Sequence, residues 1–222
     1  MDASSKYKED QTDCIVCKSE ETETFVTKDK KRYWQCQVCL SNFLDKDHHI
    51  GVEEEKSRYL EHQNSIEDPD YRKFLSRLST PLIKKLSKGN MGLDYGCGHG
   101  PALADILKGA GYNVDLYDPF FFPDKDVFSK QYNFITCTET AEHFFEPYKE
   151  FEILDKLLCR SGFLGIMTSF LPAKDAFEGW YYRRDPTHVV FYSNKSFEVI
   201  ADQRNWHIDF LEKDVVIFRK TL

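Results

Sequence analysis

The segment from Gly92 to Pro101 reads GLDYGCGHGP and carries the strongest signal in the chain. A short apolar strand leads into three glycines, Gly96, Gly98 and Gly100, which are separated by single residues. Glycines after a strand let the backbone turn tightly and approach a ligand, and they bring the N-terminus of the next helix close to it. The segment therefore predicts a nucleotide-cofactor loop at the end of a parallel strand.

Asp94 and the glycine spacing separate this loop from the dinucleotide fingerprint. That fingerprint, G-x-G-x-x-G, places its third glycine one residue later and directs a helix N-terminus at a pyrophosphate. Here the pattern is G-x-G-x-G, and Asp94 stands two residues before its first glycine. A carboxylate there repels a pyrophosphate but suits the cationic amino-acid end of S-adenosylmethionine. The sequence thus favours a sulfonium cofactor over NAD.

Asp118 ends the next predicted strand, where a carboxylate can bind ribose hydroxyls. Together with the acid and glycine triplet above, it makes residues 90–220 resemble the class I S-adenosylmethionine-dependent methyltransferases. The resemblance implies an α/β fold: a doubly wound, Rossmann-like, mostly parallel sheet of six or seven strands with a final antiparallel hairpin. It also implies that Asp118 holds the ribose of the cofactor.

The chain after Asp118 departs from the family pattern. Only 14 residues, from Pro119 to Tyr132, precede the next predicted strand, whereas a helix, an edge strand and a further helix need more. We therefore expect six strands, with the usual third strand missing or vestigial. The aromatic run beginning at Pro119 and Phe120 is expected to cover the adenine or to cap the exposed edge of the sheet.

The fourth strand of the family corresponds to residues 134–138, and Glu139 to Phe144 form the loop after it. By this resemblance Glu139 contacts the cofactor, and Glu142 and His143 lie near the acceptor. Segments just before the glycine loop often fold over the cofactor in this family. Candidates for such a lid are Arg58, Tyr59, His62 and Asn64. The expected cofactor-binding residues are Tyr59, Asp94, Gly96, Cys97, Gly98, Gly100, Asp118, Pro119, Phe120 and Glu139.

An aromatic and charged loop, residues 179–188, is the second candidate for the acceptor site because loops carried by rigid strands often bind substrates. We expect Trp180, Tyr181 and Arg184 to bind the acceptor together with Glu142. Histidine titrates near neutrality, so His143 or His188 is the candidate general base. The bland alternatives are a surface plug at the end of the sheet and two structural histidines.

Two cysteine pairs, Cys14 with Cys17 and Cys36 with Cys39, have the spacing of a zinc site. Residues 24–27 and 32–35 between them predict a β-hairpin, as in a zinc ribbon. Four thiolates close the coordination shell of the ion, so the zinc is expected to be structural. His48 and His49 are alternative ligands, but a solvated pair at a loop is the favoured interpretation.

The domain boundaries follow from these signals. We expect a mobile tail (1–13), a zinc-ribbon-like lobe (14–50), a helical linker or lid (51–90) with breaks at Pro69 and Pro81, and a cofactor-binding domain (91–222). The predicted last helix spans residues 194–204 and is capped by Ser193.

Composition limits the class of partner. The net charge of −7 disfavours a large nucleic-acid surface and makes a small-molecule acceptor the default. There is neither an apolar run of about 18 residues nor a secretion signal, so we expect a cytoplasmic protein without membrane contact, as a monomer or homodimer.

Three alternatives to a small-molecule methyltransferase remain open. An RNA methyltransferase could grip its substrate through the ribbon residues Lys28, Lys30, Lys31 and Arg32. Sugar C-methyltransferases also carry cysteine pairs before the cofactor domain. The chain could finally be a non-catalytic, cofactor-binding scaffold protein.

Overall fold

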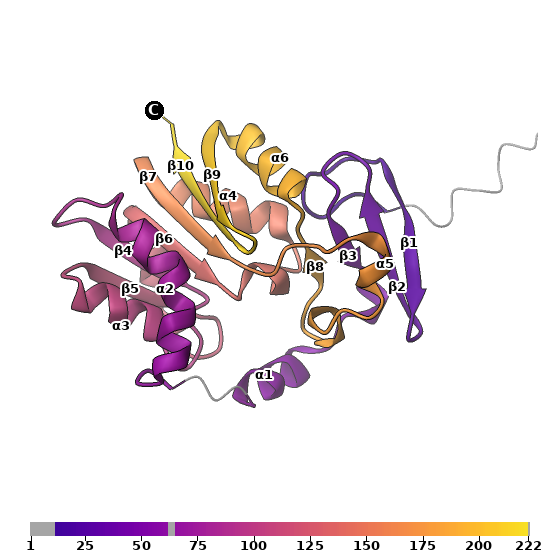
Figure 1. Ribbon diagram of the computed structural model, residues 1–222, viewed down its shortest axis with the longest axis horizontal. Coiled ribbons are helices and arrows are strands. Elements are labelled where there is room, and N and C mark those ends of the chain that lie inside the picture. Colours follow the sequence, from indigo (N-terminus) through magenta and orange to yellow (C-terminus); the bar gives the residue numbers. More distant parts are fainter. Residues whose placement is uncertain (1–11, 62–64, 222) are drawn as a thin grey trace, which may run out of the picture.

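The computed structural model describes residues 12–61 and 65–221, which form two sheets with helices on both faces of the larger one (Figure 1). The larger sheet has the order β5-β4-β6-β7-β10-β9. Its strands are β4 (Met91–Tyr95), β5 (Asn113–Tyr117), β6 (Tyr132–Thr138), β7 (Leu158–Met167), β9 (Trp206–Glu212) and β10 (Val215–Lys220).

Pairing in this sheet confirms the predicted fold class. β5, β4, β6 and β7 are parallel, and the β9–β10 hairpin joins β7 antiparallel. The sheet has six strands, as expected from the short segment after Asp118. Instead of a third strand, Asp118 and Phe122 form an isolated bridge, and a 3-10 helix spans Lys125–Ser129. The family's third strand is therefore absent from the described part of the chain.

The faces of the larger sheet are covered by different helix pairs (Figure 1). α2 (Pro69–Ile83) and α3 (Ala102–Gly109) pack on one face, α4 (Pro147–Leu157) and α6 (Asn194–Arg204) on the other. The alternation along β10 shows how one strand serves both layers: Val215 and Ile217 face the first pair, Val216 and Phe218 the second. Both faces are apolar because both are buried.

Local sequence sets the helix ends. Asp68 caps α2 by accepting hydrogen bonds from the amides of Asp70 and Tyr71, and Ser193 forms a capping box with Ser196 at the start of α6. The predicted end of α6 at residue 204 is confirmed, with Asn205 in the left-handed conformation that terminates helices.

The predicted break at Pro81 is wrong. α2 continues through Pro81 to Ile83. Proline forfeits one backbone hydrogen bond here, but the helix ends two residues later. Leu78 and Leu82, one turn apart on the same face, are fully buried, and their packing on the sheet outweighs that loss.

The smaller sheet has the order β1-β2-β3-β8 and contains the predicted hairpin. Its strands are β1 (Thr22–Lys28), β2 (Lys31–Cys36), β3 (Asn42–Leu44) and β8 (Val190–Phe191). β8 comes from the C-terminal part of the chain and pairs antiparallel with β3. The sheet therefore crosses the boundaries predicted at residues 50 and 91, and we call β1–β3 with the turns that carry the cysteine pairs the N-terminal lobe.

Shorter helical elements connect the strands and the longer helices. α1 (Val52–Leu60) follows the N-terminal lobe and lies between the two sheets at the bottom of Figure 1. α5 (Lys174–Phe177) and two 3-10 helices, Ala141–His143 and Tyr182–Arg184, lie in the loops after β6 and β7. Within the ranges 12–61 and 65–221, no helix is both long and apolar enough to cross a lipid bilayer.

Candidate active site

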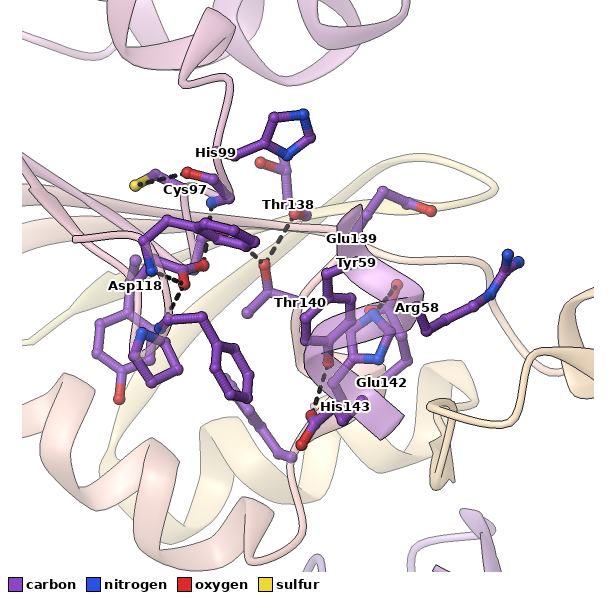
Figure 2. Close-up of a pocket in the computed structure, with 18 of the residues that line it drawn as sticks. Arg58, Tyr59, Cys97, His99, Asp118, Thr138, Glu139, Thr140, Glu142 and His143 are labelled. Carbon is purple, nitrogen blue, oxygen red and sulfur yellow. Dashed lines mark hydrogen bonds and ion pairs between the residues drawn. The ribbon is translucent and has the colours of Figure 1, made fainter. Parts of the chain in front are cut away.

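A cavity of about 1100 Å³ opens at the C-terminal ends of β4, β5 and β6. The strand order reverses beside β4, and open α/β sheets bind ligands at such switch points. Figure 2 shows Asp118 and Cys97 on one side of the pocket and Tyr59 with His143 on the other. We call these sides the cofactor half and the acceptor half.

The wall of the cavity is strongly acidic. Eight carboxylate side chains line it among the described residues, against two arginines, Arg58 and Arg184. The carboxylates are Glu55, Asp94, Asp118, Glu139, Glu142, Glu146, Glu150 and Asp185. This imbalance favours a cationic ligand over a phosphate-rich one.

The glycine loop makes room on its ligand side. Gly96 has φ +75°, and a Cβ there would lie 2.1 Å from the Cγ2 of Thr140. Gly98 has φ +62°, and no atom lies within 4 Å of the position its Cβ would take. Gly96 is thus required by the protein's own packing, whereas the space above Gly98 is left open for a ligand.

Asp118 joins the glycine loop to the aromatic segment after β5. Its Oδ2 accepts from the amide of Gly98 at 3.0 Å, and its Oδ1 accepts from the amides of Phe120 and Phe121 at 2.9 and 3.0 Å. A carboxylate offers about four lone-pair positions, so these three bonds leave capacity for a ligand hydroxyl. The carboxylate is therefore rigidly oriented before any ligand binds.

Asp94 is buried at the end of β4. Burial raises the pKa of its carboxyl to about 6, although the hydroxyl of Thr136, which donates to its Oδ1 at 2.8 Å, favours the ionised form. At neutral pH the Asp94 carboxyl is therefore ionised in most molecules, which places a negative charge in the cofactor half.

The other predicted cofactor residues also line the cavity, namely Tyr59, Cys97, Gly100, Pro119, Phe120 and Glu139. The ring of Tyr59 lies 5.7 Å from that of Phe120 and 5.2 Å from that of His143, so it contacts both halves. Glu139 has φ +48°, and burial, followed by the charge of Glu142, raises its pKa well above the ordinary value. His62 and Asn64 lie outside the described residues.

Glu142 forms the floor of the acceptor half. Its side chain is fully buried, and its Oε1 accepts a hydrogen bond from the hydroxyl of Tyr182. Its Oε2 has no hydrogen-bond partner in the described part of the chain. The Tyr182 hydroxyl also lies 3.1 Å from the Oγ1 of Thr168.

His143 and His188 lie side by side, with ring centroids 4.7 Å apart. The Nδ1 of His143 is 3.1 Å from the carbonyl of Thr187, and the Nδ1 of His188 is 2.7 Å from the carbonyl of Tyr182. Burial, and then the neighbouring His143, lower the pKa of His188 to about 4. This lowered pKa keeps the imidazole of His188 neutral near pH 7 and makes it a weaker base than an ordinary histidine.

The loop of residues 179–188, which we call the acceptor loop, has two of its predicted acceptor-binding residues in the cavity and one outside it. Tyr181 and Arg184 line the cavity, whereas Trp180 does not. Trp180 packs on Phe177, Tyr182 and Phe191 instead, at ring separations of 6.3, 5.0 and 5.7 Å. Its role as an acceptor contact is thus not supported, because this packing holds its ring on the apolar core.

Sequence reasoning missed three cavity residues that organise the acceptor half: Glu55, Tyr182 and Asp185. Asp185 accepts from the Nε and Nη2 of Arg58 at 3.1 and 2.9 Å, which ties α1 to the acceptor loop. Tyr182 lay inside the aromatic run noted in the sequence, but nothing distinguished it from its neighbours.

The four predicted zinc ligands come together in the N-terminal lobe. All four cysteines are buried, and the sulfurs of Cys14 and Cys39, and of Cys17 and Cys36, lie 3.6 Å apart. Four thiolates about 2.3 Å from a tetrahedral zinc ion would be separated by about 3.8 Å, so the cluster fits that ion. His48 and His49 are not part of the four-cysteine cluster.

The N-terminal lobe supports the acceptor loop directly. The buried Arg183 places its Nη2 2.9 Å from the Oδ2 of Asp29 and its Nη1 3.3 Å from the hydroxyl of Tyr33. The Ser196 hydroxyl donates to the carbonyl of Cys39 at 2.9 Å. Since β8 begins two residues after His188, the loop is fixed at its end by the sheet of the lobe.

Comparisons with known proteins give one consistent picture. Residues 60–209 match the family described as methyltransferase domain. No match was found among the curated proteins. Many solved structures have a fold similar to that of this chain.

The 1,6-didemethyltoxoflavin-N1-methyltransferase of Burkholderia thailandensis, solved with 1,6-didemethyltoxoflavin and S-adenosylhomocysteine, is 13% identical with a TM-score of 0.56, over 82% of this chain and 96% of that one. A SAM-dependent methyltransferase from Archaeoglobus fulgidus is 17% identical with a TM-score of 0.52, over 72% and 96%. One from Methanosarcina mazei is 13% identical with a TM-score of 0.50, over 65% and 99%. At these identities the structures show a common fold.

Proposed function

Because the chain belongs to the methyltransferase domain family, we propose that it transfers a methyl group from S-adenosylmethionine to a small-molecule acceptor in the cavity described above. The observation that carries this proposal is the composition of the cavity. Its cofactor half has an open glycine loop and a fixed carboxylate, and its acceptor half has a buried carboxylate and two imidazoles. S-adenosylmethionine is a sulfonium cation, which suits a wall in which acidic side chains outnumber basic ones.

The proposed cofactor contacts follow the fit of the residues present. Asp118 would accept hydrogen bonds from the ribose hydroxyls, and the space above Gly98 would admit the ligand against the backbone. Asp94 would favour the cationic amino-acid end of the cofactor. Phe120 and Cys97 supply apolar surface for the adenine.

The cofactor supplies an electrophilic methyl group, so the chain's own residues mainly position the acceptor and remove a proton where the acceptor needs it. Each histidine has its Nδ1 against a backbone carbonyl, which leaves its Nε2 as the proton acceptor. His143 or His188 would therefore act as a general base through Nε2 on a hydroxyl acceptor. Tyr181 and Arg184 line the acceptor side and would bind the rest of the molecule.

A small acceptor is better supported than RNA. Of the four basic residues proposed to grip RNA, Lys28 pairs with Glu178 at 3.2 Å and Arg32 with Asp45 at 2.8 Å. With two of its four cations paired to carboxylates, the ribbon has less net positive charge to offer a phosphate backbone. We further propose that zinc in the four-cysteine cluster is structural, because four thiolates leave no open coordination position.

Calorimetry and mass spectrometry test this function. The protein is expected to bind S-adenosylmethionine and S-adenosylhomocysteine but not NAD, and then to add one methyl group to a metabolite in a cell extract. Cofactor binding with no methylated product would support the scaffold alternative, and a methylated RNA would support the RNA alternative. Absence of cofactor binding would contradict the proposal.

The general-base assignment has its own test. His143→Ala and His188→Ala are each expected to keep cofactor affinity, and loss of the true base should lower turnover by roughly 10²–10⁴-fold. Full turnover in the double variant would show that positioning alone drives the reaction.

A further inference from the structure

Three side chains in the acceptor half have the arrangement of a metal site. The ligating atoms of Glu142, His143 and His188 all lie within 4.8 Å of one another. Glu142 and His143 belong to the 3-10 helix after β6, and His188 ends the acceptor loop just before β8. The cluster is separate from the four cysteines, which lie in the N-terminal lobe.

The histidines are oriented as metal ligands usually are. A ligating imidazole commonly donates its second ring N–H to a carbonyl or carboxylate, which fixes the tautomer and directs the other nitrogen at the ion. Both rings do this here: the Nδ1 of His143 faces the Thr187 carbonyl and the Nδ1 of His188 faces the Tyr182 carbonyl. Both Nε2 atoms therefore keep their lone pairs.

Glu142 provides a second, independent observation. It is fully buried, and its Oε2 lacks a hydrogen-bond partner among residues 12–61 and 65–221. A buried carboxylate oxygen without a partner is costly, and a cation would offset that cost. Its other oxygen, Oε1, accepts from the Tyr182 hydroxyl and lies 3.9 Å from the Nε2 of His143, so an outer hydrogen bond holds the carboxylate beside the imidazoles, as is common for ligating carboxylates.

We propose that Glu142, His143 and His188 bind one divalent transition-metal ion at the acceptor end of the cavity. Two imidazoles and one carboxylate suit ions such as Mn²⁺, Fe²⁺, Co²⁺ or Zn²⁺, whereas the thiolate cluster selects zinc. All three ligands line the cavity, so the remaining coordination positions face the acceptor.

The metal site also indicates which class of acceptor is methylated, and this inference rests on the proposed function. A hydroxyl oxygen bound to the ion becomes more acidic. Its proton leaves to solvent, the oxygen lone pair forms the new C–O bond, and the C–S bond of the sulfonium breaks to give S-adenosylhomocysteine. The acceptor is therefore a hydroxyl compound whose oxygen can reach the ion. This arrangement is the alternative to the histidine base considered above: both histidines ligate through Nε2, and the ion in place of a base promotes loss of the proton.

Titration of the purified, zinc-loaded full chain with Mn²⁺, followed by electron paramagnetic resonance, tests the site because Mn²⁺ avoids thiolates. One tight site per chain is expected. Glu142→Gln and His188→Ala should each weaken it at least 100-fold, and the matched control His207→Ala, exposed on β9, should leave it unchanged. Equal Mn²⁺ affinity in Glu142→Gln and wild type would overturn the proposal.

Two further measurements keep the outcomes distinct. S-adenosylmethionine affinity within a few-fold of wild type shows that a variant is folded, and His143→Gln replaces any variant that is not. Mn²⁺ binding without methyl transfer to any hydroxyl compound would leave the site in place and contradict only the acceptor class. Turnover that survives metal removal from this site, shown by loss of the Mn²⁺ signal, would overturn the catalytic role of the ion.

Discussion

The two halves of the cavity are built in different ways. The cofactor half comes from the ends of β4, β5 and β6. Its main contacts are the hydrogen bonds that nearby backbone amides donate to the Asp118 carboxylate. The acceptor half joins α1, the 3-10 helix after β6 and the acceptor loop, whose far end is fixed by the N-terminal lobe. The order of the strands in the sheet places the residues of the cofactor half. Contacts between segments far apart in the chain place those of the acceptor half.

The two halves should therefore be disturbed by substitutions in different parts of the chain. A change in the N-terminal lobe should disturb the acceptor half through Arg183 and β8 and leave the cofactor half intact. A change at a strand end should do the reverse.

Loss of the zinc site should separate the halves most clearly. Cys36→Ser is expected to lose zinc, whose binding to small zinc lobes is worth on the order of 10 kcal/mol. Residues 179–191 should then become sensitive to proteolysis, while S-adenosylmethionine affinity stays near wild type. Metal analysis, limited proteolysis and calorimetry measure the three effects.

Cys159→Ser, on β7 outside the cluster, is the matched control and should change none of them. Stoichiometric zinc in Cys36→Ser would contradict the four-cysteine site. An acceptor loop that stays protected after zinc loss would contradict its dependence on the lobe.

Asp118→Ala should break the cofactor half alone. It removes a charged acceptor and leaves the amides of Gly98, Phe120 and Phe121 without their partner. Hydrogen bonds to charged groups contribute roughly 1.5–3 kcal/mol each, so cofactor affinity should fall by about 100-fold or more. Calorimetry measures it, with Asp115→Ala on β5 as control, since Asp115 pairs with Lys130 outside this cavity. An unchanged affinity would remove the ribose assignment.

Asp94 makes the stability of the cofactor half depend on pH. Its folded pKa of about 6 exceeds the ordinary value of 3.8, so between these values the folded protein binds a proton that the unfolded chain does not. The contribution of Asp94 to stability therefore rises as pH falls from above 6 to below 4.

Asp94→Asn removes this dependence. Relative to wild type, its free energy of unfolding should rise by up to about 3 kcal/mol from pH 4 to pH 7, because only wild type loses stability over that range. Urea unfolding at several pH values measures the difference. A difference that stays constant over this range would show that burial does not shift the carboxyl.

Arg58→Ala should loosen the acceptor half slightly. The Arg58–Asp185 ion pair is partly exposed and should contribute about 0.5–1 kcal/mol. Amide hydrogen exchange in residues 52–60 is expected to become a few-fold faster, with cofactor affinity unchanged. Arg72→Ala, which breaks a comparable ion pair with Asp105 between α2 and α3, should leave that exchange as it is. Equal exchange in both variants would show that α1 is held by other contacts.

The sequence was informative where a residue's role depends on its near neighbours. The glycine loop, the cysteine pairs, the capped α6 and the missing third strand all follow from local spacing, and the structure agrees with them. Pro81 was misjudged because tertiary packing of α2 outweighs a local preference.

The acceptor half was harder to predict because its partners are distant. β8 is only two residues long and exists through its pairing with β3. Trp180 and Tyr182 share one aromatic run, yet one packs on the core and the other donates to Glu142. No local pattern separates these outcomes, because both are set by contacts with other segments.

The pairing of β3 with β8 also sets an order of folding. On a chain made from its N-terminus, the β1–β2 hairpin and both cysteine pairs are synthesised long before Val190 and Phe191. Until then β3 is an edge strand with unpaired backbone groups, which favour pairing with other chains. Closing this contact also spans a large sequence separation, and such contacts form slowly. The N-terminal lobe is therefore synthesised well before the acceptor loop, yet its sheet is completed only when β8 has been made.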